Sequence, residues 1–322
     1  MDKGVIDFHC DVLSKMLFDP AIRFEEDEKL DVSLAKLIQG GVGAQCFAVY
    51  LSERLGPPRF DDILRSIDLF RRRIVANPAM KWIRSQEDWI EWEQEASSGN
   101  KRIGALLSLE GADGLEADLT KLRICSYLGV RFLGITWNYA NWAADGVQEA
   151  RKGGFTAKGR RLVQECNRLG MLMDVSHLTE RGFWQLAEWA EKPFIASHSN
   201  AYAVCPHPRN LRDEQIKHII GMDGRIGITF VPSFVAAGKR AAVDDILRHI
   251  DHVCALGGER HIMFGSDFDG IEEWVEGLEH AGQYAQLRDS LSRHYRQELV
   301  ERFLHGNASA YLKAYLPSRN ED

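Results

Sequence analysis

Five short apolar runs in this 322-residue chain each end in a side chain that can bind a divalent metal ion. The runs extend from Val5 to Asp11, Ala105 to Gly111, Met171 to His177, Phe194 to Ser199 and Ile262 to Gly270. Each has the composition of a buried parallel strand. Because parallel strands that end at one rim bring distant residues together, we expect these groups to form one metal-dependent hydrolytic site.

The first and second of these runs supply three candidate ligands. His9 and Asp11 lie two residues apart, hence on the same face of a strand, and can bind one ion together. Alone, such a pair is typical of an ordinary hydrogen bond, and its place at the end of the first apolar run favours metal binding. Glu110 ends the second run, where a carboxylate is costly unless it is paired or bound to metal, and its two oxygens can bridge two cations.

The other three runs end in His177, His198 and Asp267. Neutral imidazoles suit zinc, manganese and similar ions, so both histidines are candidate ligands. Asp269, two residues beyond Asp267, has the sequence context of a turn or a helix N-cap. We interpret the other eight histidines mainly as surface residues, with His207 set apart because it lies in a candidate rim loop.

These runs belong to a longer alternation of strand and helix signals. Eight strands are predicted, at Val5 to Asp11, Val42 to Leu51, Ile103 to Gly111, Val130 to Asn138, Met171 to His177, Phe194 to Ser199, Ile226 to Val231 and Ile262 to Asp267. Helical patterns with apolar residues three and four apart separate them. Strand followed by helix, repeated eight times, predicts a (β/α)₈ TIM-like barrel with the metal site at the C-terminal rim of its strands.

Two connections are longer than the rest. The segment from Ser52 to Arg102 is predicted to be mostly helical, and the segment from Tyr139 to Gly159 is predicted to be a loop over the rim. Neither contains a low-complexity linker, so we expect a single domain over residues 1–322.

Composition narrows the classes of partner and the compartment. There are 40 basic and 47 acidic residues, without a basic block of the kind that nucleic acids require. No run approaches the roughly 20 apolar residues that span a bilayer, and the N-terminus lacks the features of a secretory signal. We therefore expect no nucleic-acid or membrane partner and a cytoplasmic location. The six scattered cysteines are expected to be small buried hydrophobic residues.

Together these motifs resemble the renal (membrane) dipeptidase family of the amidohydrolase superfamily. The matching segments follow the family's order and span nearly the whole chain: Asp7 to Asp11, Glu110-Gly111, Asn167 to His177, Ser197 to Tyr202 with Arg209-Asn210, and Gly265 to Gly270.

The resemblance implies a distorted barrel with two zinc ions. It assigns one ion to His9, Asp11 and Asp267 and the other to His177 and His198, with Glu110 bridging both. It further implies dipeptide hydrolysis, often with a D-residue at the C-terminal position, and a homodimer. Arg209 falls where the family binds the substrate carboxylate, a role that suits a guanidinium fork.

The chain departs from the family pattern after the fourth predicted strand. Mammalian-type members have a Thr-His pair there, whose histidine contacts the scissile group, and this chain has Thr136-Trp137-Asn138. Trp137 and Asn138 can donate hydrogen bonds to substrate but cannot act as an acid or base. The departure leaves open a second substrate class for the same site, that of a deacylase, cyclic amidase or lactonase.

We expect Asp267 to exchange a proton with the attacking water and the leaving amine, beside the bridging Glu110. Trp142, in the loop from Tyr139 to Gly159, is expected to close over the dipeptide. An alternative from another class is a non-catalytic metal-binding barrel, which the full set of ligands disfavours.

Overall fold

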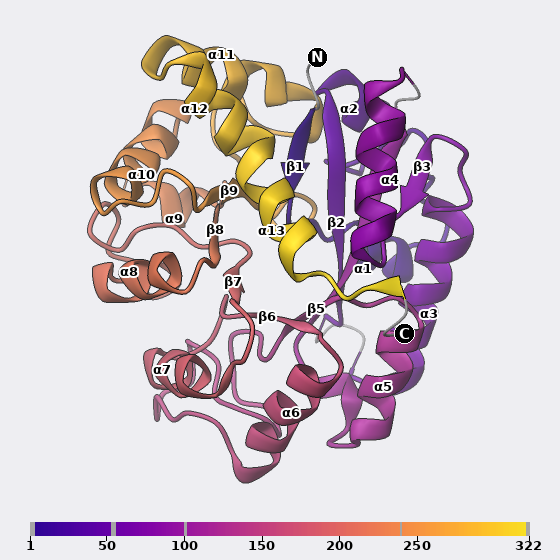
Figure 1. Ribbon diagram of the computed structural model, residues 1–322. Helices are drawn as coiled ribbons and strands as arrows, with labels where there is room; N and C mark the ends of the chain where they lie inside the picture. The colour runs from indigo at the N-terminus through magenta and orange to yellow at the C-terminus, as the bar shows by residue number, and fades with distance from the viewer. Residues whose placement is uncertain (1–3, 53–55, 100–101, 239, 320–322) are drawn as a thin grey trace.

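Eight parallel strands close into a barrel in the computed structural model, which describes residues 4–52, 56–99, 102–238 and 240–319 (Figure 1). The strands are β1 (Val5–Asp7), β2 (Val42–Tyr50), β4 (Ile103–Glu110), β5 (Phe132–Gly134), β6 (Leu172–Asp174), β7 (Ile195–Ala196), β8 (Arg225–Ile228) and β9 (Ile262–Phe264). They pair in the order β2-β1-β9-β8-β7-β6-β5-β4, and pairing of β2 with β4 closes the ring. The prediction of a TIM-like barrel is confirmed.

Helices follow the strands and surround the barrel (Figure 1). They are α1 (Val12–Phe18), α2 (Leu34–Gln39), α3 (Phe60–Leu69), α4 (Gln86–Ser97), α5 (Leu119–Tyr127), α6 (Ala157–Arg168), α7 (Glu180–Trp189), α8 (Asp213–Gly221), α9 (Pro232–Val235), α10 (Val243–Ala255), α11 (Tyr284–His294), α12 (Gln297–Glu301) and α13 (Asn307–Tyr315). Short 3-10 turns lie at η3 (Asp113–Leu115) and η4 (Ala281–Gln283), and π turns lie at η2 (Phe70–Ile74) and η5 (Arg302–Gly306). None of the helices in the described ranges is long and apolar enough to cross a membrane.

The segment from Ser52 to Arg102 contains a strand that the sequence pattern missed. Residues 53–55 and 100–101 of this segment lie outside the described part of the chain. After η2, strand β3 (Met80–Trp82) pairs in parallel with the start of β4, where Met80 lies opposite Ile103. Three residues are too few to show a two-residue period, which explains why helical signals on either side dominated the prediction.

Most predicted strands are longer than the observed ones. β6 ends at Asp174 and β9 at Phe264, three residues before the predicted ends at His177 and Asp267. The backbone leaves the ladder at these ends, so the candidate ligands stand on the turns that follow the strands.

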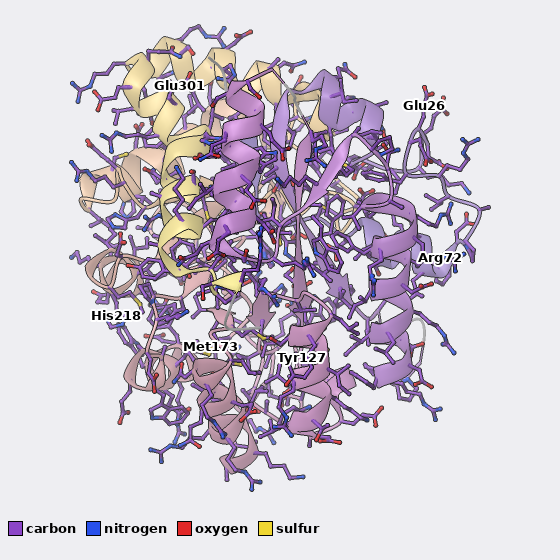
Figure 2. All side chains as sticks on the ribbon, turned by 45° about the vertical axis from the view of Figure 1, so that its right-hand side comes forward. Glu26, Arg72, Tyr127, Met173, His218 and Glu301 are labelled. Carbon is purple, nitrogen blue, oxygen red and sulfur yellow. The ribbon has the colours of Figure 1, made fainter. Side chains whose placement is uncertain are left out.

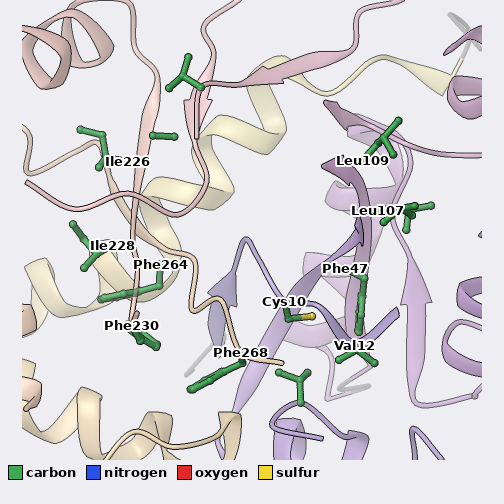
Figure 3. Packing of buried hydrophobic residues seen from close by; sticks show 14 of the residues in the cluster. Cys10, Val12, Phe47, Leu107, Leu109, Ile226, Ile228, Phe230, Phe264 and Phe268 are labelled. Atoms are coloured by element: carbon green, nitrogen blue, oxygen red, sulfur yellow. The ribbon is translucent and has the colours of Figure 1, made fainter. Parts of the chain in front are cut away.

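The two faces of the barrel sheet bury separate hydrophobic clusters. The outer cluster joins strands to helices and includes Phe47 and Leu107 on β2 and β4, and Ile228 and Phe264 on β8 and β9 (Figure 3). The inner cluster contains alternate strand residues, such as Leu106, together with side chains of α4 and α13. The filled interior gives the rim a rigid base.

Candidate active site

Glu110, the last residue of β4, lies at the centre of the predicted site. Its Oε2 atom lies 3.5 Å from His9 Nε2. Its Oε1 atom lies 2.9 Å from His177 Nε2 and 3.6 Å from His198 Nε2. Since each carboxylate oxygen faces different imidazoles, Glu110 can contact two cations at once.

His9, Asp11 and Asp267 form one side of the site, because β1 and β9 are neighbours in the barrel. His9 Nε2 lies 3.4 Å from Asp11 Oδ2 and 3.7 Å from Asp267 Oδ1. A ligand atom from each of the three residues lies within 4.8 Å of the other two, so one ion can contact all three.

His177 and His198 form the other side. Their Nε2 atoms lie 2.9 Å apart. Unless a proton lies between them, two neutral rings at this distance point lone pairs at each other. A cation between these nitrogens and Glu110 removes the conflict.

Two further atoms show that the donor set fits metal ions. His9 Nε2 and Asp11 Oδ1 are buried without a hydrogen-bond partner among the described residues. An orphaned buried polar atom costs about 1–3 kcal/mol, and native structures contain few of them. A divalent cation bound by these two residues could satisfy them.

The backbone at His177 and Asp267 adopts the left-handed conformation, with φ of 71° and 67°. This conformation costs a non-glycine residue on the order of 1–3 kcal/mol and is enriched at functional sites. Here it turns the chain out of the barrel directly after β6 and β9 while the two side chains stay with the other ligands.

Hydrogen bonds fix the orientation of the two paired histidines. His177 Nδ1 lies 2.9 Å from Asn138 Oδ1, an acceptor, so this nitrogen carries the proton and Nε2 is left as the free donor atom for a metal. His198 Nδ1 lies 2.7 Å from Ser197 Oγ. Ser197 Oγ in turn donates a short hydrogen bond to Asp174 Oδ2. Asn138 therefore supports a candidate ligand directly and also lines the cavity, while its contact with substrate stays a prediction.

A second buried carboxylate ties β1 to the turn after β9. Asp7 accepts hydrogen bonds from Ser266 N at 2.9 Å, Ser266 Oγ at 2.7 Å and Tyr284 Oη at 2.9 Å. Burial raises the pKa of Asp7, and the donors on Ser266 oppose this rise. The bonds connect the backbone that carries His9 to the backbone that carries Asp267.

In the absence of metal, the site holds protons tightly. Burial lowers the pKa of His9, but the negative charges of Glu110, Asp11 and Asp267 outweigh it and raise the pKa to about 10. Burial also raises the pKa of Glu110 and of Asp267, against the opposing charge of His9.

The paired histidines behave in the opposite way. Burial lowers the pKa of His177 and of His198 well below its usual value, and the positive charges of Arg209 and His9 add to this effect. Both imidazoles are therefore neutral at physiological pH, as metal ligation requires.

The site opens into a cavity of about 680 Å³, a volume typical of small-molecule sites. Asp11, Glu110, His177 and Asp267 line its inner end, where Trp137 and Asn138 also contribute. The Trp137 ring centroid lies 6.2 Å from that of His177. Trp137 thus occupies a position from which a substrate can be reached.

Arg209 lies at the site but lines a different cavity, of about 150 Å³, which also borders on His177. Its side chain is 4% exposed, and Nη2 lies 3.4 Å from the carbonyl oxygen of His198. Its Nε atom is buried without a hydrogen-bond partner in the described part of the protein. The charge and the free donor suit a substrate carboxylate.

The structure does not bring Trp142 to either cavity. Its Nε1 donates to Ala112 O at 2.6 Å, and its ring packs against the outer hydrophobic cluster. In this structure Trp142 does not line the substrate cavity, and its closing over a bound dipeptide stays a prediction. The indole anchors its loop instead.

Two of the histidines interpreted as surface residues are buried. His249 accepts a hydrogen bond from Ala201 N at 3.1 Å and donates to Val235 O at 2.9 Å. His305 is 4% exposed and lies beside Glu93, with 3.3 Å between its Nε2 and Glu93 Oε1. Their helical context gave no sign that neighbouring loops and helices cover them. All six cysteines are free, five are buried and Cys254 is half-buried, as expected for unpaired hydrophobic residues.

Sequence reasoning missed the supporting residues Asp7, Asp174 and Ser197. All three lie inside the apolar runs, so their positions offered a signal, but their partners come from other strands. Asp269 was interpreted as a turn residue, and its carboxylate indeed accepts from Asp31 N at 2.8 Å and Val32 N at 2.9 Å.

A parallel-strand barrel with imidazoles and carboxylates converging on its C-terminal rim defines a metal-dependent hydrolase of the amidohydrolase type. A sequence profile described as Membrane dipeptidase (Peptidase family M19) matches residues 2–315. The chain belongs to this family of metallo-dipeptidases.

Individual relatives agree with this assignment. An uncharacterised dipeptidase of Schizosaccharomyces pombe is 32% identical over 82% of this chain and 67% of its own length. The crystal structure of a metallopeptidase named dipeptidase AC superposes with a TM-score of 0.89 at 30% identity, covering 99% of this chain and all of that one. A metallopeptidase from Rhodobacter sphaeroides, solved with a phosphinate mimic of L-Ala-D-Ala, gives a TM-score of 0.87 at 28% identity over 97% of this chain and 99% of its own.

Proposed function

We propose that this protein is a binuclear zinc dipeptidase that cleaves free dipeptides, including those with a D-residue at the C-terminal position. The observation that carries the proposal is the position of Glu110, with one oxygen toward His9 and the other toward His177 and His198. A mixed set of imidazoles and carboxylates is typical of zinc. The D-residue is suggested by the dipeptide mimic bound to the Rhodobacter relative.

When bound, divalent ions supply Lewis-acid activation of water and of the scissile carbonyl. The protein contributes proton transfer and orientation. Asp267, at the inner end of the cavity, accepts the proton of the attacking water and returns it to the leaving amine. Arg209 binds the free carboxylate of the substrate, while Trp137 borders the bound peptide.

The test is hydrolysis of a panel of L-L, L-D and N-acetylated dipeptides by enzyme loaded with zinc and by enzyme stripped with a chelator. Zinc-dependent cleavage of free dipeptides, with two zinc ions per chain by metal analysis, is the expected result. Cleavage of the L-D members tests the stereochemical part. Activity confined to N-acetylated compounds would favour the deacylase alternative, and one tightly bound ion with full activity would contradict the binuclear site.

Three expectations accompany this proposal as predictions: one domain over residues 1–322, a homodimer and a cytoplasmic location. Free cysteines in the structure are consistent with a reducing compartment. Limited proteolysis, analytical ultracentrifugation and cell fractionation respectively test the three.

A further inference from the structure

The two cavities that share His177 differ in size and in the groups that line them. The larger one contains the carboxylates of the metal site at its inner end and extends outward along α1 and the turn after β9. The smaller one, about 150 Å³, contains Arg209 but none of those carboxylates. A dipeptide bound across His177 therefore meets different surroundings at its two ends.

The outer part of the larger cavity combines paired charged groups with apolar side chains. Four of its charged groups are paired within the wall: Lys15 Nζ lies 2.8 Å from Asp269 Oδ1, and Lys29 Nζ lies 2.7 Å from Asp19 Oδ2. Glu272 adds a further carboxylate to the lining. The remaining outer surface includes Phe18, Ile22 and Ile271, which come from α1, the segment after it and the turn after β9.

Phe18 is the most prominent of these side chains. It ends α1 and is 64% exposed, although the ring is large and apolar. A single exposed aromatic residue needs no explanation on an open surface. At the lip of a cavity, however, it offers an apolar area that a ligand side chain can cover.

The smaller cavity suits a short side chain next to a carboxylate. Arg209, Arg212 and Lys152 line it, and only Arg212 has an acidic partner in the same wall, Glu180 at 3.1 Å. The surplus of positive charge favours the C-terminal end of a peptide. A volume of about 150 Å³ is that of a cavity that holds a molecule the size of benzene, so it leaves room for a small side chain only.

We infer that the enzyme selects dipeptides with a large apolar N-terminal residue and a small C-terminal residue. The inference rests on the proposed function, because Arg209 fixes the direction of the peptide by binding its C-terminal carboxylate. The N-terminal side chain then extends into the larger cavity and packs against Phe18, Ile22 and Ile271. Phe18 is thus a specificity-determining residue of this chain.

The first experiment compares kcat/KM of the zinc-loaded enzyme for Phe-Ala, Ala-Phe and Gly-Ala. We expect Phe-Ala to exceed Ala-Phe by at least about tenfold, since a misplaced large side chain loses its apolar contacts and collides with the small cavity. Equal values for Phe-Ala and Ala-Phe would overturn the inference and leave the proposed function intact. No cleavage of any dipeptide would overturn the proposed function itself.

The second experiment uses Phe18→Ala and Ile271→Ala. Each is expected to raise KM for Phe-Ala about fivefold to tenfold with little change in kcat, because uniform binding is lost, and so to lower the ratio of Phe-Ala to Gly-Ala activity. Tyr127→Ala is the matched control. This aromatic residue ends α5 and is 67% exposed, and it lines neither cavity. Figure 2 labels it on the ribbon of α5. An unchanged substrate ratio in both cavity variants would contradict the assignment.

Discussion

At the scale of single residues, the site concentrates features that most of the protein avoids. His9 Nε2 and Asp11 Oδ1 are buried without a hydrogen-bond partner among the residues that the structure describes, and His177 and Asp267 have left-handed backbone conformations. Each feature costs free energy in the metal-free protein. Their convergence within one site is explained if bound cations satisfy the orphaned atoms.

Replacement of Asp267 by Asn tests its role in proton transfer. The amide preserves shape but cannot accept the proton of water, so we expect kcat for a dipeptide to fall by at least about 100-fold. Circular dichroism and the metal content per chain should be measured on the same samples, since Asn is also a weaker ligand. Near-normal turnover with normal metal content would assign the proton transfer to another group.

Replacement of Asn138 by Ala tests the support of His177. Without its acceptor, the imidazole loses its fixed tautomer and orientation, and we expect metal affinity to fall about 10- to 100-fold. Competition with a chelating dye gives the affinity. Asn167→Ala is a suitable control because the Asn167 amide donates a hydrogen bond to Trp189 O at 2.8 Å, between the outer helices α6 and α7. This variant should bind metal normally. Unchanged affinity in Asn138→Ala would show that His177 is held by packing alone.

At the scale of elements, the barrel strands supply the positions of the ligands and the turns after them supply the orientations. The prediction placed each candidate ligand at a strand end, and its position relative to the observed strand end agrees to within a few residues. The turns could not be derived, because left-handed residues at His177 and Asp267 depend on contacts with other strands. The same holds for α10, whose His249 is buried only because it bonds to the backbone at Ala201 and Val235.

His249 makes the stability of this connection dependent on pH. Burial lowers its pKa from 6.5 to about 4. Between these values the unfolded chain binds the proton and the folded chain does not, so the stabilisation present above pH 6.5 is lost as pH falls to 4. The loss amounts to ~3 kcal/mol.

We expect His249→Gln to be less stable than the wild type at pH 7 and to approach it as pH falls to 4. Urea unfolding of both proteins at several pH values, with the same metal loading, measures the difference. A gap that stays constant over this range would show that His249 does not carry the pH dependence.

At the scale of the whole molecule, we expect metal binding and folding to be coupled. The candidate ligands come from β1, β4, β6, β7 and β9 or the turns after them, so bound ions would connect strands around most of the barrel. Only the folded chain brings these side chains together. A metal ion present at about 1,000 times its Kd would then stabilise the folded state by ~4 kcal/mol.

Removal of metal should therefore lower Tm by on the order of 10 °C, and excess zinc should restore it. Differential scanning calorimetry before and after dialysis against a chelator measures the shift. The control is a His198→Ala variant, whose Tm should respond less because one ligand is missing. An identical Tm with and without metal would mean that the barrel does not depend on the ions.

The sequence by itself determined the barrel and the six candidate ligands. Apolar runs that alternate with helical patterns indicate buried strands, and the residues at the ends of parallel strands lie together at one rim of a barrel. It also determined that the six cysteines are unpaired, since they are widely scattered along the sequence. Only the tertiary structure decided which side chains support the ligands, such as Asn138 on His177 and Ser197 on His198. It alone showed that Trp142 is hydrogen-bonded to Ala112 and does not line the substrate cavity. It also showed that Arg209 and Phe18 line two different cavities. Those contacts join residues from different strands and loops, and their distances depend on how the closed barrel packs rather than on any local pattern.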